Sequence, residues 1–325
     1  MNKVNILITG AGGAAAIALQ KTYAPRRDLQ IFMADMDTLS SGLYLVPAKQ
    51  RLQLPAGDSE SYAEKLLALC VQHEIDLLIP TVDVELVPIA SRQDAFESAG
   101  IKVLISPLST LKVCYDKLRL MQFLDGEHPL AGYAVFDEHI DLPASVYPFI
   151  LKPRVGSGAR GIRLIQSPKD ALGVPRDGSY LFQEYLPGAE YSVDVYVTAN
   201  GNVVASVVRE RLKIDSGIAV ISRTIKNVEL SAQAEKIARL IGIRYVANIQ
   251  FRLDQHGQAR LLEVNPRFPG TMPLTIAAGV DMPAMCLADA MHKPLPTHCT
   301  YEEIAMVRAW QEYFLPISEL TGGHK

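Results

Sequence analysis

The sequence predicts a mixed α/β and α+β protein, in which a Rossmann-like amino-terminal domain precedes a region built on antiparallel strands. Residues 4–9 and 29–34 are short apolar runs, separated by a Gly-rich turn and an Ala-rich stretch that reaches Tyr23. This β-loop-α-β order is typical of a parallel sheet. Later in the chain, two strand-like runs, 246–253 and 258–264, flank a short turn and predict an antiparallel hairpin.

The composition is that of a globular protein of two or three domains. The 325 residues are 49% hydrophobic and 21% charged, with a net charge of −3. This balance gives no reason to expect nucleic acid or an anionic membrane as a partner. The chain shows no signal-peptide pattern and no apolar run of about eighteen residues, so we expect a cytoplasmic protein. The four cysteines are widely spaced, which indicates neither a zinc site nor a disulfide scaffold.

A turn with Gly10, Gly12 and Gly13 follows the first strand, and Asp35 follows the second. This start resembles a nucleotide-binding Rossmann unit with an acid where a ribose would bind. The glycines do not reproduce G-x-G-x-x-G, because Ala15 holds the last position. A doubly wound domain without a dinucleotide is therefore favoured, and a dehydrogenase is the weakest functional interpretation.

Polar residues follow the apolar strand predicted at 76–80. Crevices beyond the carboxyl ends of parallel strands are where open α/β sheets bind ligands. Asp83 and Glu85 are therefore candidates for substrate contacts. Capping of the next helix by Thr81 or Asp83 explains these residues nearly as well.

The hairpin turn at 254–257 sets the expected register of its two strands. If Asp254 pairs with Gly257, Asn248 lies opposite Glu263 and Gln250 is diagonal to Glu263. One face of the sheet then carries amides and a carboxylate within the reach of a single ion.

Asn265 and Arg267 follow Glu263 at a spacing of two and share its face. Amide and carboxylate oxygens suit Mg²⁺ or Mn²⁺, which prefers a few hard ligands. An arginine beside such a metal can stabilise charge that develops during phosphoryl transfer. A solvated polar face without any ion is the alternative.

A second candidate site begins at Lys152, near the end of a strand predicted at 147–153. The loop 154–161 follows directly and contains Gly156, Ser157, Gly158 and Gly161. Such a loop can fold its backbone N–H groups around phosphate oxygens, while the lysine neutralises their charge. An ordinary mobile hairpin loop is the alternative, and the adjacent lysine favours phosphate binding.

These features resemble the ATP-grasp superfamily, most closely its carbamoyl-phosphate-synthase-like and amino-acid ligase members. The motifs that carry the resemblance are, in order, the strand with Lys152 and its glycine loop, Q-E-Y-L-P-G-A-E-Y-S-V-D at 183–194, N-I-Q-F at 248–251 and L-L-E-V-N-P-R at 261–267. The resemblance covers nearly the whole chain. It implies a pre-ATP-grasp Rossmann-like domain at 1–107 and a two-subdomain ATP-grasp fold, with a small lid subdomain at 108–183 and a large subdomain at 184–325.

The resemblance also implies a role for each matching residue. It places phosphate contacts at Lys117, Lys152, Gly156, Ser157, Gly158 and Gly161; the adenine hinge at Glu184, Tyr185 and Leu186; a ribose contact at Glu190; ligands of two Mg²⁺ or Mn²⁺ ions at Gln250, Glu263 and Asn265; and the arginine that steadies the transferred phosphoryl at Arg267. Many members have an acid where Gln250 stands. Because carbamoyl-phosphate-synthase-like members also carry Gln, we interpret Gln250 as a subfamily mark.

Residues 209–217 form a charged strand that enters a Gly-containing loop. In the resembling enzymes this segment lines the space between the triphosphate and the acceptor. Arg209, Arg211 and Lys213 are thus candidates for phosphate or substrate-carboxylate contacts, and Arg209 and Lys213 join Lys152 and Arg267 as catalytic candidates. A solvated edge strand is the alternative explanation of the charges.

The implied function is an ATP-dependent carboxylate–amine ligase acting on small molecules through an acyl phosphate, with release of ADP and phosphate. Carboxyphosphate chemistry from bicarbonate, as in carbamoyl phosphate formation, is a second possibility. A protein that binds ATP for regulation without turnover is a third. Family members are often dimeric, so a homodimer is compatible with the resemblance.

Four further elements are predicted from periodicity and propensity. They are helices at 108–124, 231–241 and 284–291 and a strand at 305–314 that contains Trp310.

Overall fold

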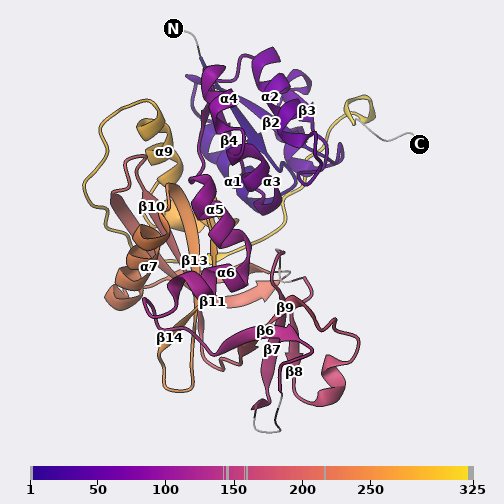
Figure 1. Ribbon diagram of the computed structural model, residues 1–325. Helices are drawn as coiled ribbons and strands as arrows, with labels where there is room; N and C mark the ends of the chain where they lie inside the picture. Colours follow the sequence, from indigo (N-terminus) through magenta and orange to yellow (C-terminus); the bar gives the residue numbers. More distant parts are fainter. Residues whose placement is uncertain are drawn as a thin grey trace.

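Three β-sheets organise the chain in the computed structural model, which describes residues 3–141, 143, 146–156, 158, 160–215 and 217–320. In Figure 1 the amino-terminal sheet lies at the top, the sheet with β10, β11, β13 and β14 below it, and the sheet with β6 to β9 at the bottom. The predicted combination of a parallel and an antiparallel architecture is confirmed.

The amino-terminal sheet has the strand order β3-β2-β1-β4-β5, and every pair of neighbours is parallel. Its strands are β1 (Val4–Thr9), β2 (Leu29–Asp35), β3 (Arg51–Gln53), β4 (Leu77–Ile79) and β5 (Lys102–Val103), and its helices are α1 (Ala14–Tyr23), α2 (Tyr62–Gln72), α3 (Asp83–Ala90) and α4 (Gln93–Ser98). Alternate residues of β1 enter different cores: Ile6 and Ile8 join one apolar cluster, whereas Leu7 joins another. The sheet is thus buried on both faces, as expected of a doubly wound domain.

The single helix predicted at 108–124 is wrong, because the segment forms two helices. α5 (Leu108–Tyr115) and α6 (Lys117–Leu124) meet at Asp116, whose backbone is extended. The Asp116 carboxylate accepts a hydrogen bond from Leu118 N and so caps α6. This break places Lys117 in the first turn of a new helix.

The four-stranded antiparallel sheet has the order β6-β9-β7-β8. Its elements are β6 (Tyr133–Asp137), β7 (Phe149–Pro153), β8 (Arg163–Ile165), the 3-10 turn η4 (Pro168–Ala171) and β9 (Asp177–Glu184). Phe136, Phe149, Leu151 and Ile165 form its separate small core. With its own core, this lobe can be displaced from the rest of the chain without exposing the larger clusters.

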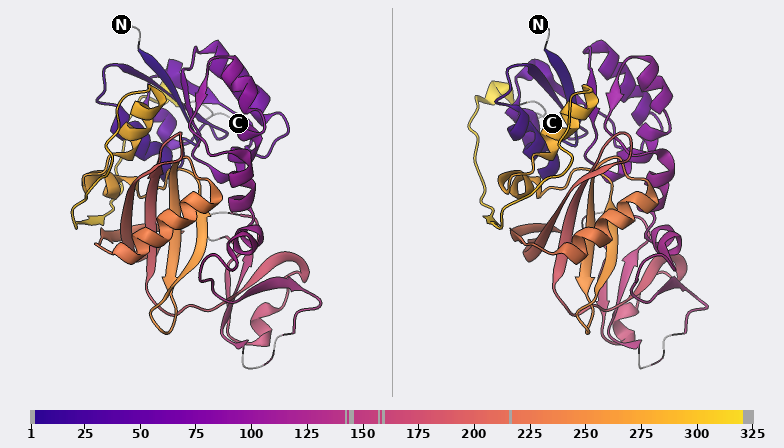
Figure 2. Two further views of the ribbon diagram at one scale, coloured as in Figure 1. Left: turned by 60° about the vertical axis from the view of Figure 1, so that its left-hand side comes forward. Right: turned by 90° about the vertical axis from the view of Figure 1, so that its left-hand side faces the viewer.

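The six-stranded sheet has the order β14-β13-β10-β11-β12-β15, with antiparallel neighbours. Its strands are β10 (Glu190–Val197), β11 (Val203–Asp215), β12 (Ile218–Thr224), β13 (Tyr245–Leu253), β14 (Ala259–Asn265) and β15 (Ala305–Val307), and α7 (Val228–Ile241), α8 (Met272–Ala277) and α9 (Met282–Ala290) accompany it. Figure 2 shows α7 lying across one face of this sheet. β11 lies between β10 and β12, so the edge-strand explanation is wrong for Arg209. Beyond Glu210 the strand pairs with β12 alone, and Lys213 is exposed there, as that explanation expected.

The strand predicted at 305–314 is also wrong beyond its first three residues. β15 pairs with β12, and Arg308 N still donates to Val220 O. β12 runs antiparallel to β15 and begins at Ile218, so the residues soon after Arg308 lie beyond its start and do not pair with it. Trp310 is 97% exposed.

The carboxy-terminal segment instead returns to the amino-terminal sheet, as the yellow trace in Figure 2 shows. Arg51 donates to the Glu319 carbonyl and carboxylate, and Lys21 donates to Gln311. Within the described residues, no helix combines the length and the apolar character that crossing a membrane requires.

Candidate active site

A cavity of about 600 Å³ opens where the three sheets meet. Its lining includes Gly13, Thr81 and Asp83 from the amino-terminal domain, Lys152, Gly158, Arg160 and Glu184 from the four-stranded lobe, and Glu190, Arg211, Gln250, Glu263, Asn265 and Arg267 from the six-stranded region. Pockets for small-molecule ligands have volumes of roughly 300–1,000 Å³. The cavity therefore has room for a nucleotide and a small acceptor together.

The β13–β14 hairpin forms as predicted, but its register differs from the expected one. Gln250 lies directly opposite Glu263, and Asn248 lies opposite Asn265. The turn is one residue longer than assumed, because Asp254 N donates to Gln258 O, and the register shifts again between Gln250 and Phe251. The correction brings the Gln250 and Glu263 side chains closer than a diagonal pair.

The hydrogen bonds of these side chains leave hard oxygen atoms available to a cation. Asn265 Nδ2 donates to Glu263 Oε1 at 2.9 Å, so the second Glu263 oxygen and the Asn265 carbonyl oxygen lack a partner in this pair. Across the described ranges, no three His, Cys, Asp or Glu side chains converge as in a metal cluster. One carboxylate with two amides nevertheless fits Mg²⁺, which takes few protein ligands and completes its shell with phosphate and water.

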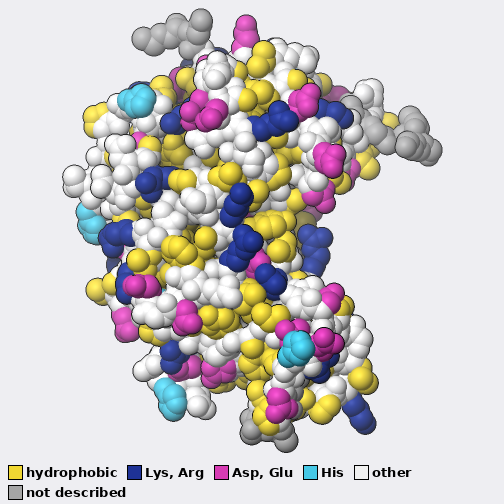
Figure 3. Space-filling view, viewed as in Figure 1, with side chains coloured by type: hydrophobic (Ala, Val, Ile, Leu, Met, Phe, Trp, Pro, Cys, Tyr) yellow, Lys and Arg dark blue, Asp and Glu magenta, His cyan; other side chains and the backbone are white. Residues whose placement is uncertain are grey.

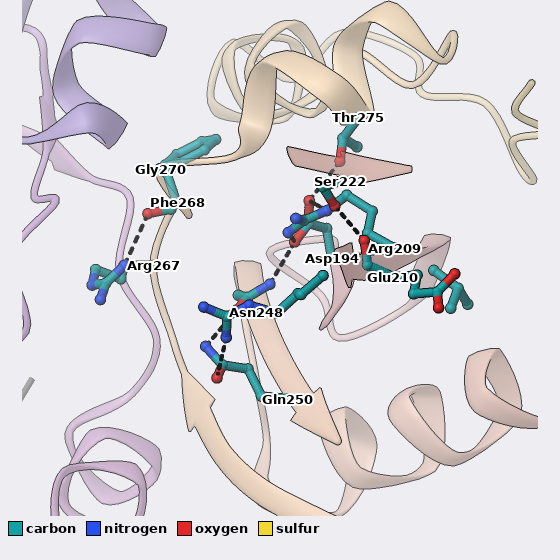
Figure 4. A network of polar contacts seen from close by, with 12 residues as sticks. Asp194, Arg209, Glu210, Ser222, Asn248, Gln250, Arg267, Phe268, Gly270 and Thr275 are labelled. Atoms are coloured by element: carbon teal, nitrogen blue, oxygen red, sulfur yellow. Dashed lines mark hydrogen bonds and ion pairs between the residues drawn. The ribbon is translucent and has the colours of Figure 1, made fainter. Parts of the chain in front are cut away.

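A chain of hydrogen bonds fixes the orientation of the Gln250 amide (Figure 4). Asn248 Nδ2 donates to Asp194 at 2.7 Å, and Gln250 Nε2 donates to Asn248 Oδ1 at 3.2 Å. Because Asp194 is fully buried and bound to the Arg209 guanidinium, it acts only as an acceptor here. The Gln250 oxygen is thereby directed away from Asn248 and toward Arg211, which donates to it at 2.9 Å.

Two cations expected to contact phosphate or substrate do not line the cavity. Arg209 is 1% exposed and forms a bidentate pair with Asp194, to which Thr275 also donates. Lys213 is exposed on β11. The place of this segment in the resembling enzymes pointed to both residues, whereas Arg209 is buried against Asp194 and Lys213 is exposed to solvent.

Arg211, between these two residues, does line the cavity. It donates to Glu190 at 2.7 Å as well as to Gln250, and burial lowers its pKa against the opposing effect of Glu190. Arg252 lies 3.8 Å from the other Glu190 oxygen. The candidate ribose ligand Glu190 is therefore held between two guanidinium groups, beside the candidate metal ligand Gln250.

Lys152 is a buried cation of the cavity, and its pKa is strongly lowered. It is 4% exposed and donates to Leu262 O at 3.0 Å. Burial lowers its pKa to about 8, with Lys117 acting in the same direction and Glu263 opposing it. Its ammonium is thus poorly compensated and would gain strongly from phosphate oxygens.

The glycine loop is hydrogen-bonded to Lys117 at two points. Lys117 Nζ donates to Gly156 O at 2.9 Å, and Arg154 O accepts from Lys117 N. Gly156 lines a small cavity of about 70 Å³ that shares Asp83, Glu263 and Asn265 with the large one. Gly156 of the loop thus lies close to the candidate metal ligands Glu263 and Asn265.

The rest of the loop closes one side of the large cavity. Gly158 and Arg160 line that cavity, and a Cβ on Gly217 would lie only 3.1 Å from Gly158 C. Gly161 has a φ of +77° and does not line either cavity. Ser157 lies outside the described residues.

The expected adenine hinge forms the end of the cavity beside β9. Glu184, Tyr185 and Leu186 all line it. The Glu184 carboxylate also accepts a hydrogen bond from Gly132 N at 3.0 Å. Gln183, which the sequence analysis missed, is 2% exposed, lines the cavity, and has no hydrogen-bond partner at Nε2. The period of two along β9 could have identified it, because Gln183 and Glu184 must face opposite sides.

Arg267 extends from the loop after β14 and contacts the amino-terminal domain. Its Nε and Nη2 atoms donate to the two Asp83 oxygens at 2.8 and 2.7 Å, and Nη1 donates to Phe268 O, a contact drawn in Figure 4. Asp83 is therefore at the crevice, as one of its two interpretations expected. Glu85 is instead buried and accepts from Thr81 N and Val82 N. The capping of α3 by Thr81 or Asp83 is wrong, because Val82 is the N-cap residue and Asp83 is already the first residue of the helix.

The amino-terminal glycine turn is explained by packing. Gly10 has a φ of +66°, and a Cβ there would lie 2.3 Å from Val82 Cγ2. Asp35 accepts from Gly12 N at 2.8 Å, so its carboxylate caps the turn. These contacts favour the doubly wound domain without a dinucleotide.

Figure 3 shows a short row of Lys and Arg side chains near the middle of one face, with Asp and Glu side chains mostly above and below it.

Two family models match the chain. One, described as ATP-grasp in the biosynthetic pathway with Ter operon, matches residues 177–313, and one, described as PylC-like, N-terminal domain, matches residues 6–104. The second match covers the parallel sheet. The first includes the hinge, β10 to β14 and Arg267.

Curated relatives and solved structures agree with these matches. The chain is 27% identical over 199 residues to the arginine-specific carbamoyl phosphate synthase large chain of Bacillus subtilis (strain 168), covering 56% of this chain and 19% of the relative. It is 29% identical over 126 residues to a D-alanine–D-alanine ligase of Thermotoga sp. (strain RQ2), covering 37% of this chain and 42% of the relative. The chain thus spans less than half the length of these relatives.

The fold is similar to that of N5-carboxyaminoimidazole synthetase from Staphylococcus aureus complexed with ADP. The TM-score is 0.75 at 17% identity, over 95% of this chain and 83% of that one. The predicted Rossmann-like domain and two-subdomain ATP-grasp fold are confirmed. The chain is thus similar to a PylC-like N-terminal domain over residues 6–104 and to an ATP-grasp domain over residues 177–313.

Proposed function

We propose that this protein is an ATP-dependent carboxylate–amine ligase. A carboxylate oxygen attacks the γ-phosphorus of ATP, the bond to the β-γ bridging oxygen breaks, and an acyl phosphate and ADP form. An amine then attacks the acyl carbon, phosphate leaves with the bonding electron pair, and the amine proton is released. The products are an amide-type bond, ADP and phosphate.

The convergence of four side chains in one cavity carries this proposal. Lys152, Glu263, Asn265 and Arg267 all line it, next to the hinge at Tyr185. Binding an adenine ring alone requires none of these four. A cation, a metal-binding carboxylate and an arginine beside a nucleotide-sized space are the parts that phosphoryl transfer uses.

The chain's own residues would position ATP from end to end. The apolar side chain of Leu186 and the amide of Gln183 would contact the base, and the Glu190 carboxylate would accept hydrogen bonds from the ribose hydroxyls. Lys152 and Lys117 would neutralise phosphate oxygens, with Gly156, Ser157, Gly158 and Gly161 as the loop that folds over them. Catalysis would then be chiefly positioning and charge neutralisation.

Glu263, Asn265 and Gln250 would hold magnesium, with Mn²⁺ as a substitute and two ions as the proposed number. Bound magnesium would offset the charge of the β- and γ-phosphates during transfer. Arg267 would contact the transferred phosphoryl group and the acyl phosphate oxygens. Arg209 and Lys213 have no part in the proposed chemistry, because neither lines the cavity.

The paired state of the cavity's arginines bears on the substrates. Arg211 and Arg267 each already pair with a carboxylate of the protein. They are therefore less available to bind a substrate carboxylate than their charge suggested. Small-molecule carboxylate and amine substrates remain the proposed class.

Carboxyphosphate chemistry is the second candidate, favoured by the likeness to a carbamoyl phosphate synthase. In that case bicarbonate would replace the organic carboxylate as the phosphoryl acceptor. The same cavity would serve both reactions, and the acceptor pool in the test below separates them.

The test is ADP release from Mg·ATP by the purified protein, screened with pools of amino acids, small carboxylic acids, amines and bicarbonate. Turnover that depends on one pool and is lost in Arg267→Ala is the expected result. Lys213→Met, an exposed cation outside the cavity, is the matched control and should retain turnover.

A rise in melting temperature with Mg·ATP measures binding separately. Binding without turnover in any pool would favour the regulatory alternative. Failure to bind ATP would contradict the roles proposed for Lys152 and the hinge.

The domain ranges 1–107, 108–183 and 184–325 and the cytoplasmic location belong to the same proposal, together with a homodimer. Sedimentation equilibrium tests the dimer, and a mass of one chain at micromolar concentration would contradict it.

A further inference from the structure

The guanidinium of Arg267 has a defined set of partners. A guanidinium carries five N–H groups in one plane. Nε and Nη2 donate to Asp83, and Nη1 donates to Phe268 O at 3.2 Å. Of the five N–H groups, one on Nη1 and one on Nη2 are not used by these two partners.

Asp83 is itself held by a rigid part of the amino-terminal domain. It is the first residue of α3, and Glu85 on the same turn is fully enclosed. Glu85 accepts hydrogen bonds from Thr9 Oγ1, Thr81 N, Val82 N and the Tyr62 hydroxyl. These bonds tie the first turn of α3, which carries Asp83, to β1 and α2.

We infer that Asp83 is the positioning residue for Arg267: it binds the Nε/Nη2 edge, so that the Nη1/Nη2 edge is the part of the guanidinium presented to the transferred phosphoryl group. This inference rests on the proposed function. Two parallel N–H groups of one edge match two oxygens of a phosphoryl or carboxylate group. The amino-terminal domain thereby takes part in phosphoryl transfer without touching ATP.

The contact also makes the arginine position depend on how the domains dock. Asp83 and Arg267 are separated by 184 residues, and both line the large cavity. Displacement of α3 would carry the Asp83 carboxylate with it and turn the guanidinium. Charge and geometry both matter, because an amide at position 83 would offer one acceptor oxygen and one repelling N–H group.

The experiment compares the full-length protein with Asp83→Asn, Arg267→Ala and the double variant. Two affinities are measured by calorimetry: that for Mg·ADP, and that for Mg·ADP with aluminium fluoride, which imitates the phosphoryl group in flight. Asp83→Asn should leave the affinity for Mg·ADP nearly unchanged and weaken the aluminium fluoride complex by about tenfold or more, because a small misplacement of a transition-state contact is costly.

The double variant decides whether Asp83 acts through Arg267. If it does, adding Asp83→Asn to Arg267→Ala costs nothing further. An additive loss in the double variant would overturn the inference, as would equal losses for Mg·ADP and for the aluminium fluoride complex, or no loss at all. Where a substrate pool supports turnover, kcat should fall in Asp83→Asn while KM for ATP stays.

The matched control is Glu319→Gln, which removes another ion pair between distant segments, that with Arg51, outside both cavities. It should behave as the wild type in both titrations. Equal weakening by Glu319→Gln would show a general loss of domain docking and overturn the specific role of Asp83. A wild-type protein that binds no Mg·ADP would overturn the proposed function itself, and the inference with it.

Discussion

Gln250 lies directly opposite Glu263 across the β13–β14 ladder. Their side chains therefore face the cavity as neighbours, and both line it. The Gln250 oxygen shares the Arg211 guanidinium with Glu190. The pair thus combines one negative candidate ligand, Glu263, with one neutral candidate ligand, Gln250, whose orientation is set by hydrogen bonds.

Exchanging these two ligands should change the metal requirement in opposite directions. Glu263→Gln removes the only carboxylate of the donor set, so turnover should fall on the order of 10²-fold and more Mg²⁺ should be needed. Gln250→Glu adds a charge, so half-maximal activity should need less Mg²⁺. Magnesium titrations of ADP release measure both, with exposed Gln255→Glu as the control.

If Gln250→Glu left the magnesium titration unchanged, Gln250 would not be a ligand. Its role would then be restricted to holding Arg211.

Binding of ATP should be coupled to proton uptake at Lys152. Because burial lowers the pKa of Lys152 to about 8, roughly half of the free protein has a neutral lysine at pH 8. Phosphate oxygens raise this pKa, so ATP binding should take up about half a proton at pH 8 and much less at pH 7. The measurement is calorimetry of Mg·ATP binding in buffers with different ionisation enthalpies.

Lys152→Met should abolish the uptake, and Lys152→Arg should also lack it because a guanidinium stays charged. Unchanged proton uptake in Lys152→Met would assign the proton to another group. The same pKa shift has a consequence for folding. The unfolded chain binds more protons than the folded one between about pH 8 and 10.5, so the contribution of Lys152 to the unfolding free energy rises with pH there.

The sequence predicted which residues of the hairpin share one face better than it predicted their pairing. A period of two placed Glu263, Asn265 and Arg267 on one face regardless of register. The partner of Glu263 depended on the turn length and on a bulge beside Phe251, which are tertiary features that a four-residue turn motif does not encode. The two strands of this hairpin were therefore predictable, whereas the contacts that fix their register were not.

The roles of the charged residues were the least predictable part of the site. Arg209, Arg211 and Lys213 lie within five residues of one strand, yet only Arg211 lines the cavity. Arg209 differs from Arg211 because its guanidinium donates two hydrogen bonds to Asp194, a buried acid on the neighbouring strand. Such a partner is identified by the β10–β11 pairing, and no local sequence pattern reveals it.

The Gln183 amide should contribute to recognition of the base. Its Nε2 atom is buried without a partner at the hinge end of the cavity, and such a donor gains from an acceptor on the ligand. N7 is the acceptor of adenine that 7-deaza-ATP lacks. Wild-type protein should therefore bind 7-deaza-ATP about fivefold more weakly than ATP, as expected for one hydrogen bond of about 1 kcal/mol.

In Gln183→Glu the donor is absent, and the two nucleotides should bind equally. Competition titrations against Mg·ADP measure the difference. A preference for ATP that persists in Gln183→Glu would place N7 against another group.

Arg209 and Lys213 should differ sharply in their effect on stability, although the same role was expected of both. Arg209→Met leaves the Asp194 carboxylate buried without its cation, which should cost about 3–5 kcal/mol of unfolding free energy. Lys213→Met changes an exposed side chain and should stay within about 0.5 kcal/mol. Urea denaturation measures both, and the double variant Asp194→Leu with Arg209→Met, which removes both charges, should recover part of the loss. A large loss of turnover in Lys213→Met at unchanged stability would instead return that lysine to the reaction, since an exposed residue can affect catalysis only by reaching the substrate or the loop over it.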